Sequence, residues 1–246
     1  MLKVVANLLF LISFTASGAQ TISFAVGHDH DKMVKHYAFY AASWEIVNHE
    51  LELLGYEVTA NAYPWARAKE MVKNGQHHGL FLAANFQGRD KWALFSQALG
   101  KDQFGLFKHK EGGSTGPIAS VRLISDYSLV SFISPKTQLQ LATAQEGLNL
   151  LANKKVKGFV MSRSYGEYLL ATELNDIAEK IAFDTNRYDL YSAHIAVSKT
   201  HKEAEGTVAL IDKALANSIA SGRYQDIMTK HQVRGVQLMA KDSGNK

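Results

Sequence analysis

Apolar positions in the first hundred residues follow the periods of strands and helices in turn. Residues 21–26 alternate Ile22, Phe24 and Val26 with smaller side chains, which predicts a strand that ends at Gly27. An apolar stripe at spacings of three and four then predicts one helix that stops at Gly55. Its members are Met33, Tyr37, Tyr40, Trp44, Val47, Leu51 and Leu54. The stretch from His28 to Lys35 fits a loop equally well.

A second strand, Tyr56 to Ala60, leads into a turn, a short helix and a third strand. Pro64 suits the first turn of a helix because it lacks an N–H that would find no partner there. Gly75 suits the stop because glycine tolerates positive φ. Leu80 to Ala84 is an unbroken apolar run, which is typical of a strand covered on both faces.

Strands and helices that alternate with connections this short predict parallel strands with right-handed crossovers. Ligands of such sheets bind beyond the carboxyl ends of the strands. The rule indicates three loops, Gly27–Asp31, Asn61–Trp65 and Asn85–Arg89, and we expect them to converge on one crevice.

The second half of the chain predicts a further set of strands and capped helices. The predicted strands are Ile118–Ile124, Leu129–Ser134 and Val156–Met161. Thr143 with Glu146 has the spacing of a capping box, which predicts a helix to about Asn153. Ser164 with Glu167 has the same spacing and predicts a helix that runs toward Leu174.

The first 19 residues have the pattern of a secretory signal peptide. Lys3 precedes an apolar stretch, Val4 to Phe14, and Ser17 and Ala19 stand where a signal peptidase reads small residues. Because a membrane span needs ~20 apolar residues, a cleaved signal is favoured over an anchor. We therefore expect a mature chain that starts near Gln20.

The chain contains no cysteine, so neither a lipidated cysteine nor a disulfide is expected. We expect a soluble periplasmic protein, with secretion as the alternative, and its 227 residues after the signal can bury a core without disulfides. Without Lys3, 26 basic and 23 acidic residues give a net charge of +3. Because the basic residues are scattered, nucleic acid is not an expected partner.

Several stretches, in the same order, resemble the family 3 extracellular solute-binding proteins, the type II periplasmic receptors of ABC importers for polar amino acids and similar solutes. In the first half they are PWARA (from Pro64), the Arg89 loop, the pair Phe95–Ser96 and QFGLFKHK (from Gln103). In the tail, Ala193 to His231 is similar to the family ending, in which a strand re-enters the first lobe and a long helix, a glycine and a short helix follow.

The resemblance implies an α/β fold of two lobes, each a mostly parallel sheet flanked by helices. It implies a signal peptide at 1–19, lobe 1 at 20–109 and 193–246, and lobe 2 at 110–192. Crossing segments near Phe104–Lys110 and Arg187–Ile195 are the implied hinge. A receptor of this kind closes two lobes on its solute, which must contact both of them.

In the family, an arginine at the position that resembles Arg89 binds the carboxylate of the solute. A guanidinium suits this role because its planar fork donates two parallel hydrogen bonds and keeps its charge in a dry cleft. The Asn85 amide replaces some of the bonding of the small hydroxyl residues that often precede that arginine. The alternative is a surface arginine beside Asp90 and Lys91.

The second lobe departs from an amino-acid receptor. Where the family offers an aspartate to the ammonium group, this chain reads Met161, Ser162, Arg163, Ser164. A cation at Arg163 favours an anionic or dicarboxylic solute; the alternative is an ordinary solvated side chain. The resemblance also places Thr137 at a turn whose backbone N–H groups face an anionic ligand.

Among the aromatic and histidine residues, Tyr63, Phe86 and His28 are the candidates for the cleft wall, because ligand clefts favour aromatic walls with a few polar groups. Trp65 is expected in the core. A metal site is not favoured, because His28 and His30 lie at the opposite end of the sheet from His77 and His78.

The predicted function is capture of a small carboxylate-bearing solute, an amino acid or related organic anion, and its delivery to the membrane permease of an ABC importer. We expect a monomer without cofactor or catalytic residues, since no nucleophile elbow or phosphate-binding glycine loop is present. The alternatives are a ligand-sensing subunit of a membrane signalling protein and an enzyme on the same fold.

Overall fold

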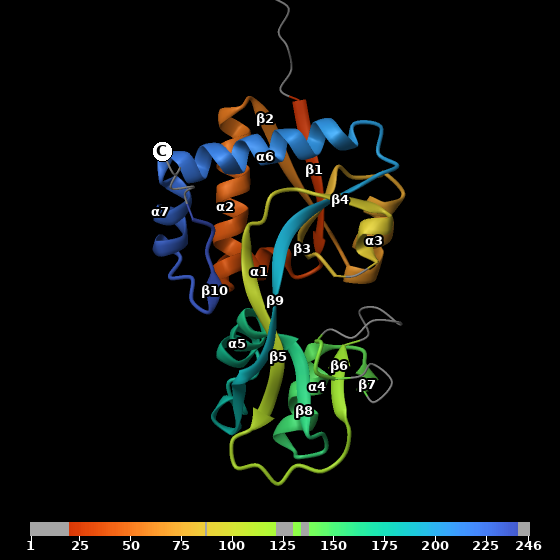
Figure 1. The fold of residues 1–246 in the computed structure, drawn as a ribbon, viewed down its shortest axis with the longest axis vertical. Coiled ribbons are helices and arrows are strands. Elements are labelled where there is room, and N and C mark those ends of the chain that lie inside the picture. Colours follow the sequence, from red (N-terminus) through yellow and green to blue (C-terminus); the bar gives the residue numbers. More distant parts are fainter. Residues whose placement is uncertain (1–19, 87, 122–129, 134–137, 241–246) are drawn as a thin grey trace, which may run out of the picture.

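A computed structural model of the chain describes residues 20–86, 88–121, 130–133 and 138–240. These residues form two lobes stacked along the long axis of the molecule (Figure 1). Two strands, β5 (Gly100–His109) and β9 (Ile181–Ser198), run from one lobe into the other and pair with each other over most of β5. The two-lobed α/β fold with two crossing segments is therefore confirmed.

The other elements are distributed over the two lobes as follows. The upper lobe contains β1 (Gln20–Gly27), α1 (His30–His36), α2 (Ala38–Leu53), β2 (Tyr56–Tyr63), α3 (Trp65–Lys73), β3 (Gly79–Ala84), β4 (Ala93–Phe95), α6 (Ala204–Ser221), α7 (Arg223–Lys230) and β10 (Val236–Gln237). The lower lobe contains β6 (Ile118–Val121), β7 (Gln138–Leu141), α4 (Ala144–Ala152), β8 (Gly158–Ser162) and α5 (Arg163–Thr172). Two short 3-10 helices lie at Arg89–Lys91 and Ala178–Lys180.

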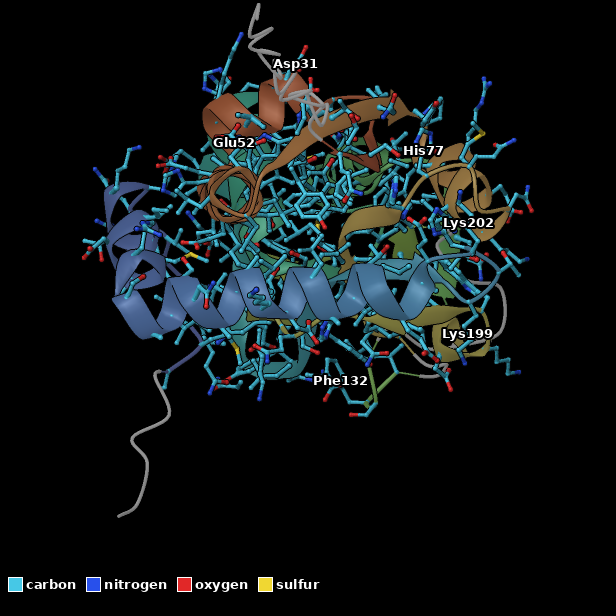
Figure 2. The ribbon with its side chains drawn as sticks, turned by 90° about the horizontal axis from the view of Figure 1, so that it is seen from above. Asp31, Glu52, His77, Phe132, Lys199 and Lys202 are labelled. Carbon is cyan, nitrogen blue, oxygen red and sulfur yellow. The ribbon has the colours of Figure 1, made fainter. Side chains whose placement is uncertain are left out.

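One strand order passes through both lobes: β2-β1-β3-β9-β5-β8-β6-β7, with β4 on β9 and β10 on β5. In the upper lobe β2, β1 and β3 are parallel, as predicted, with Gly27 opposite Tyr63 at the carboxyl ends of β1 and β2. In the lower lobe β8, β6 and β7 are also parallel. Seen from above, α6 extends across the upper lobe (Figure 2).

The predicted helix from Met33 to Leu54 is divided into α1 and α2 at Tyr37, whose backbone is extended with φ −103° and ψ 98°. The stripe is otherwise as expected, since Tyr40, Val47 and Leu51 are buried. The break has a tertiary cause, because Tyr37 packs against α5 of the other lobe. The stretch that fitted a loop equally well is mostly helix α1.

Two predictions for the lower lobe are wrong. Val130 to Ile133, part of the predicted strand Leu129–Ser134, form turns, and the unpredicted strand β7 supplies the sheet edge. Helix α5 is capped by Ser162, whose hydroxyl accepts from the Tyr165 N–H at 3.2 Å, and not by Ser164. Because the helix begins at Arg163, Ser164 lies inside its first turn and not at the cap position that a capping box with Glu167 requires.

The cap of α4 is as predicted. The Thr143 hydroxyl accepts from the Glu146 N–H at 3.1 Å, and the Glu146 carboxylate accepts from the Ala142 N–H at 3.3 Å. The helix then extends to Ala152. The first bond satisfies an N–H group that the first turn of a helix leaves without an internal partner, and the second goes to the residue before the cap instead of to the cap N–H of a standard capping box.

Candidate functional site

The carboxyl ends of β1, β2 and β3 lie at the edge of the upper sheet that faces the lower lobe (Figure 1). The topology therefore brings the three loops after Gly27, Tyr63 and Ala84 to this edge. The third loop carries Arg89, in a 3-10 turn entered through Gly88 with φ 83°. This positive φ is a conformation that glycine adopts without strain.

Arg89 is a buried cation, only 5% exposed. Its Nη1 donates to the carbonyl oxygen of Ala84, and its guanidinium lies 5.4 Å from the centroid of the Phe86 ring. None of the ion pairs among the described residues includes Arg89. Burial lowers the pKa of Arg89 to about 10, so the group stays charged at neutral pH.

A second cation lies within electrostatic range of the first. Lys69, on α3, is half-buried, and burial followed by the nearby charge of Arg89 lowers its pKa. The positive charges of Arg89 and Lys69 repel each other in a partly buried environment, and a bound anion would stabilise both of them.

Phe86 connects the Arg89 loop to the hinge and to the lower lobe. Its ring packs edge-to-face on Phe104 of β5 at 5.2 Å and on Tyr191 of β9 at 4.8 Å. The same cluster includes Val130 and Ile133. Phe86 is therefore a buried contact between the two lobes and not an exposed wall residue.

The remaining upper-lobe candidates have different surroundings. Asn85 is exposed, and its backbone N–H donates to the Ser192 carbonyl of β9 at 3.1 Å. The Tyr63 hydroxyl lies 3.1 Å from His77 Nε2, and the ring lies 5.4 Å from the Arg67 guanidinium. His28 is exposed, directly after β1. Trp65 packs with Tyr63 against a small apolar cluster, as expected.

Arg163 begins α5 and is already paired. Its Nε donates to Glu167 at 2.7 Å and its Nη1 to the Gln103 side-chain oxygen at 2.9 Å. Its guanidinium also lies 5.4 Å from the Phe183 centroid. Thr137, the other lower-lobe candidate, lies outside the described residues.

The sequence analysis missed Asp102, on β5. Its carboxylate is buried and accepts from the Ser162 hydroxyl, from the Ser164 hydroxyl at 2.6 Å and from the Gln103 N–H at 2.8 Å. Burial raises the pKa of Asp102, although these hydrogen bonds oppose the shift. Asp102 stands between Lys101 and Gln103, so the local sequence gives no signal of its burial.

Within the described ranges, no three or more His, Asp or Glu side chains are arranged to hold a metal ion. The same residues include no helix with the length and apolar character of a membrane span.

A comparison of the sequence with protein-family models and with curated proteins finds no match. Solved structures do match. The substrate-binding protein of an ABC uptake transporter from Streptococcus pneumoniae, with bound histidine, is 18% identical, with a TM-score of 0.69 over 90% of this chain and 95% of that chain. The periplasmic binding protein of an arginine transport system from Legionella pneumophila is 15% identical, with a TM-score of 0.69 over 86% and 99%.

A histidine kinase sensor domain with similarity to periplasmic binding proteins is 16% identical, with a TM-score of 0.70 over 90% of this chain and 99% of that domain. At such identities the likeness establishes the fold and leaves the ligand and the partner open. The chain has the two-lobed fold of the periplasmic substrate-binding proteins. This is the fold that the resemblance of its sequence motifs implied.

Proposed function

We propose that this protein is a solute-binding protein that captures a small carboxylate-bearing solute, an amino acid or a related organic anion, between its two lobes. The observation that carries the proposal is Arg89, a buried guanidinium that takes part in no ion pair among the described residues. Removing a charge from water is costly unless a partner compensates it. An anionic solute supplies that partner.

The loop of Arg89 provides further groups for such a solute. The Asn85 amide can donate beside the guanidinium, and Lys69 adds a second positive charge. Tyr63 and His28 stand at the ends of the neighbouring strands, and the buried Phe86 ring supports the Arg89 guanidinium from behind. From the lower lobe, Thr137 and Arg163 complete the proposed set; Arg163 contributes only if the solute competes with Glu167 for it.

The mechanism is capture without chemistry. The crossing strands β5 and β9 are the proposed hinge, and the solute stabilises the closed arrangement by touching both lobes. We propose that the chain is exported to the periplasm after cleavage near Ala19 and acts as a monomer. The closed form then delivers the solute to the permease of an ABC importer.

A sensor role is the second candidate. It rests on the likeness to a histidine kinase sensor domain over nearly all of both chains. In this role the same closed form is read by a membrane signalling protein instead of a permease. Deletion of the gene separates the two roles, because an importer receptor is needed for uptake of the solute and a sensor for the response to it.

The binding proposal is tested by thermal denaturation of the mature protein with amino acids, dicarboxylates and sugar acids, followed by calorimetry on any hit. A solute that binds only the folded state raises the melting temperature. Replacing Arg89 by Ala should weaken the binding by about 1.5 to 3 kcal/mol. The control is Lys213→Ala, which removes an exposed positive charge on α6, away from the edge that faces the lower lobe. If the Arg89→Ala variant bound the solute as tightly as the unsubstituted protein, Arg89 would not be part of the binding site.

A further inference from the structure

The lobes touch directly where α1 and the start of α2 face α5, one above the other in Figure 1. The Tyr37 ring stacks on Tyr168 with centroids 5.3 Å apart and an interplanar angle of 18°, and it lies 5.9 Å from Tyr165. At the end of α5, Lys32 Nζ of α1 lies 2.6 Å from Glu173 Oε1. These contacts join residues more than 120 positions apart in the sequence, and both partners of each belong to the chain itself.

A buried hydrogen-bond chain extends this contact to the hinge. The Ser164 hydroxyl donates to Asp102 at 2.6 Å, so its oxygen is left to accept from the Tyr37 hydroxyl at 2.5 Å. Tyr37 belongs to the upper lobe, Ser164 to the lower lobe and Asp102 to the crossing strand β5. All three side chains are buried, which keeps water from replacing any of the bonds while the lobes are closed.

A second interlobe contact lies elsewhere along the hinge. Asp31, on α1, and Phe132, of the Phe86 cluster, project at opposite sides of the molecule (Figure 2). The tyrosines of the first contact and Phe86 belong to different apolar clusters, so these are two separate interlobe contacts. An opening motion about β5 and β9 has to break at least one of these two contacts.

In a receptor that closes only on its solute, the solute supplies the contacts that favour the closed state. Here the chain supplies them itself. We propose that Tyr37, Ser164 and Asp102, with the ion pair of Lys32 and Glu173, form an interlobe latch that keeps the two lobes closed without a solute. The solute-free protein then presents the closed surface to its partner, and any ligand or partner that opens the lobes has to displace the latch. The latch holds whether or not Arg89 binds a carboxylate.

The absence of cysteine makes the test direct, because two introduced cysteines are the only sites for a thiol-reactive spin label. Lys213→Cys on α6 and Lys155→Cys beside β8 are exposed and lie in different lobes, far from the hinge. Pulsed electron resonance then measures the label-to-label distance in the solute-free mature protein. With the latch intact we expect a single short distance distribution.

Tyr37→Phe and Ser164→Ala should each lower the closed-to-open ratio about tenfold, because each removes a buried hydrogen bond in a chain that ends on a carboxylate. A longer distance should then appear beside the short one. Ser218→Ala is the matched control, since that buried hydroxyl has no hydrogen-bond partner among the described residues. Circular dichroism and melting temperature establish that each variant is folded.

A charge exchange gives a second, surface-level test that leaves the core intact. Lys32→Glu and Glu173→Lys should each increase the open population, and the double variant should restore the short distance, because the ion pair is re-formed in the opposite sense. A mainly open distance in the unsubstituted chain would overturn the latch. So would an unchanged distribution in folded Tyr37→Phe and Ser164→Ala, or, if these do not fold, a charge exchange that leaves the distance unaffected.

Discussion

The guanidinium of Arg89 lies 5.4 Å from the centroid of the Phe86 ring, so the buried cation and the side chain that bridges the lobes sit on one loop. Phe86 reaches both crossing strands through Phe104 and Tyr191. Phe86 therefore packs against both the guanidinium and the crossing strands. The proposed anion site and the lobe interface are therefore only three residues apart in the sequence, at Arg89 and Phe86.

The first prediction concerns the cost of keeping Arg89 buried. Arg89→Met retains the apolar stem and removes a charge that no described carboxylate compensates. The free energy of unfolding of the solute-free variant should therefore stay the same or rise by about 1 kcal/mol. Binding of the anionic solute should be lost. Urea unfolding of the solute-free protein measures the first effect. A large loss of stability would mean that Arg89 is a structural residue instead of a ligand-binding one.

The second prediction concerns Phe86. Phe86→Ala should destabilise the protein by about 3 to 5 kcal/mol, because it leaves a cavity in a cluster that joins the Arg89 loop, the hinge and the lower lobe. Phe132→Ala, at the half-buried margin of the same cluster, should cost clearly less. Urea unfolding compares the two. Equal losses would indicate that Phe86 carries no more of the interface than its neighbour.

The third prediction concerns pH. Burial lowers the pKa of His30, His77, His78 and His194 below the ordinary value of 6.5. Below pH 6.5 these histidines therefore bind protons more readily in the unfolded chain than in the folded chain. The stability that the neutral histidines give should be fully present above pH 6.5 and should be lost as the pH falls through their folded-state pKa values. Asp102, with its raised pKa, acts in the opposite direction.

A single variant separates these effects. Nδ1 of His194 donates to the Ser96 carbonyl at 2.7 Å, so in the neutral ring Nε2 accepts from the Ser192 hydroxyl at 2.6 Å. His194→Gln should leave a smaller stability difference between about pH 8 and about pH 5 than the unsubstituted chain shows. Urea unfolding at the two pH values is the measurement, and parallel curves would contradict the assignment.

The sequence predicted the upper lobe well because each of its elements carries a local signal. The apolar run before Ala84 and the stops at Gly55 and Gly75, which have φ of 85° and 72°, need no distant contact to be interpreted. The strand-end rule also placed Arg89 at the edge that faces the other lobe. Its burial could not be inferred, since it depends on Phe86 and on a cluster assembled from both lobes.

The errors lie where contacts between lobes override local preference. The break at Tyr37 lies where its ring packs on Tyr165 and Tyr168 of the other lobe, and its hydroxyl contacts Ser164 across the interface. Ser162 and Ser164 are both competent caps by residue type, and both hydroxyls donate to Asp102; Ser162 caps α5 because the helix begins at Arg163. Val130 and Ile133 bury their side chains in the same apolar cluster as Phe86 and do not pair in a sheet.

The last prediction concerns two glycines that differ in their surroundings. A Cβ on Gly105, in β5, would meet the Arg187 backbone oxygen of β9 at 2.6 Å, where the pairing of β5 and β9 shifts register. Gly105→Ala should therefore destabilise the protein by about 1 to 3 kcal/mol and disturb the crossing strands. A Cβ on Gly206, within α6, meets nothing within 4 Å, so Gly206→Ala should stabilise it by about 0.5 to 1 kcal/mol. Thermal unfolding of the two variants gives both signs, and a neutral Gly105→Ala would show that the two strands can separate at this point without cost.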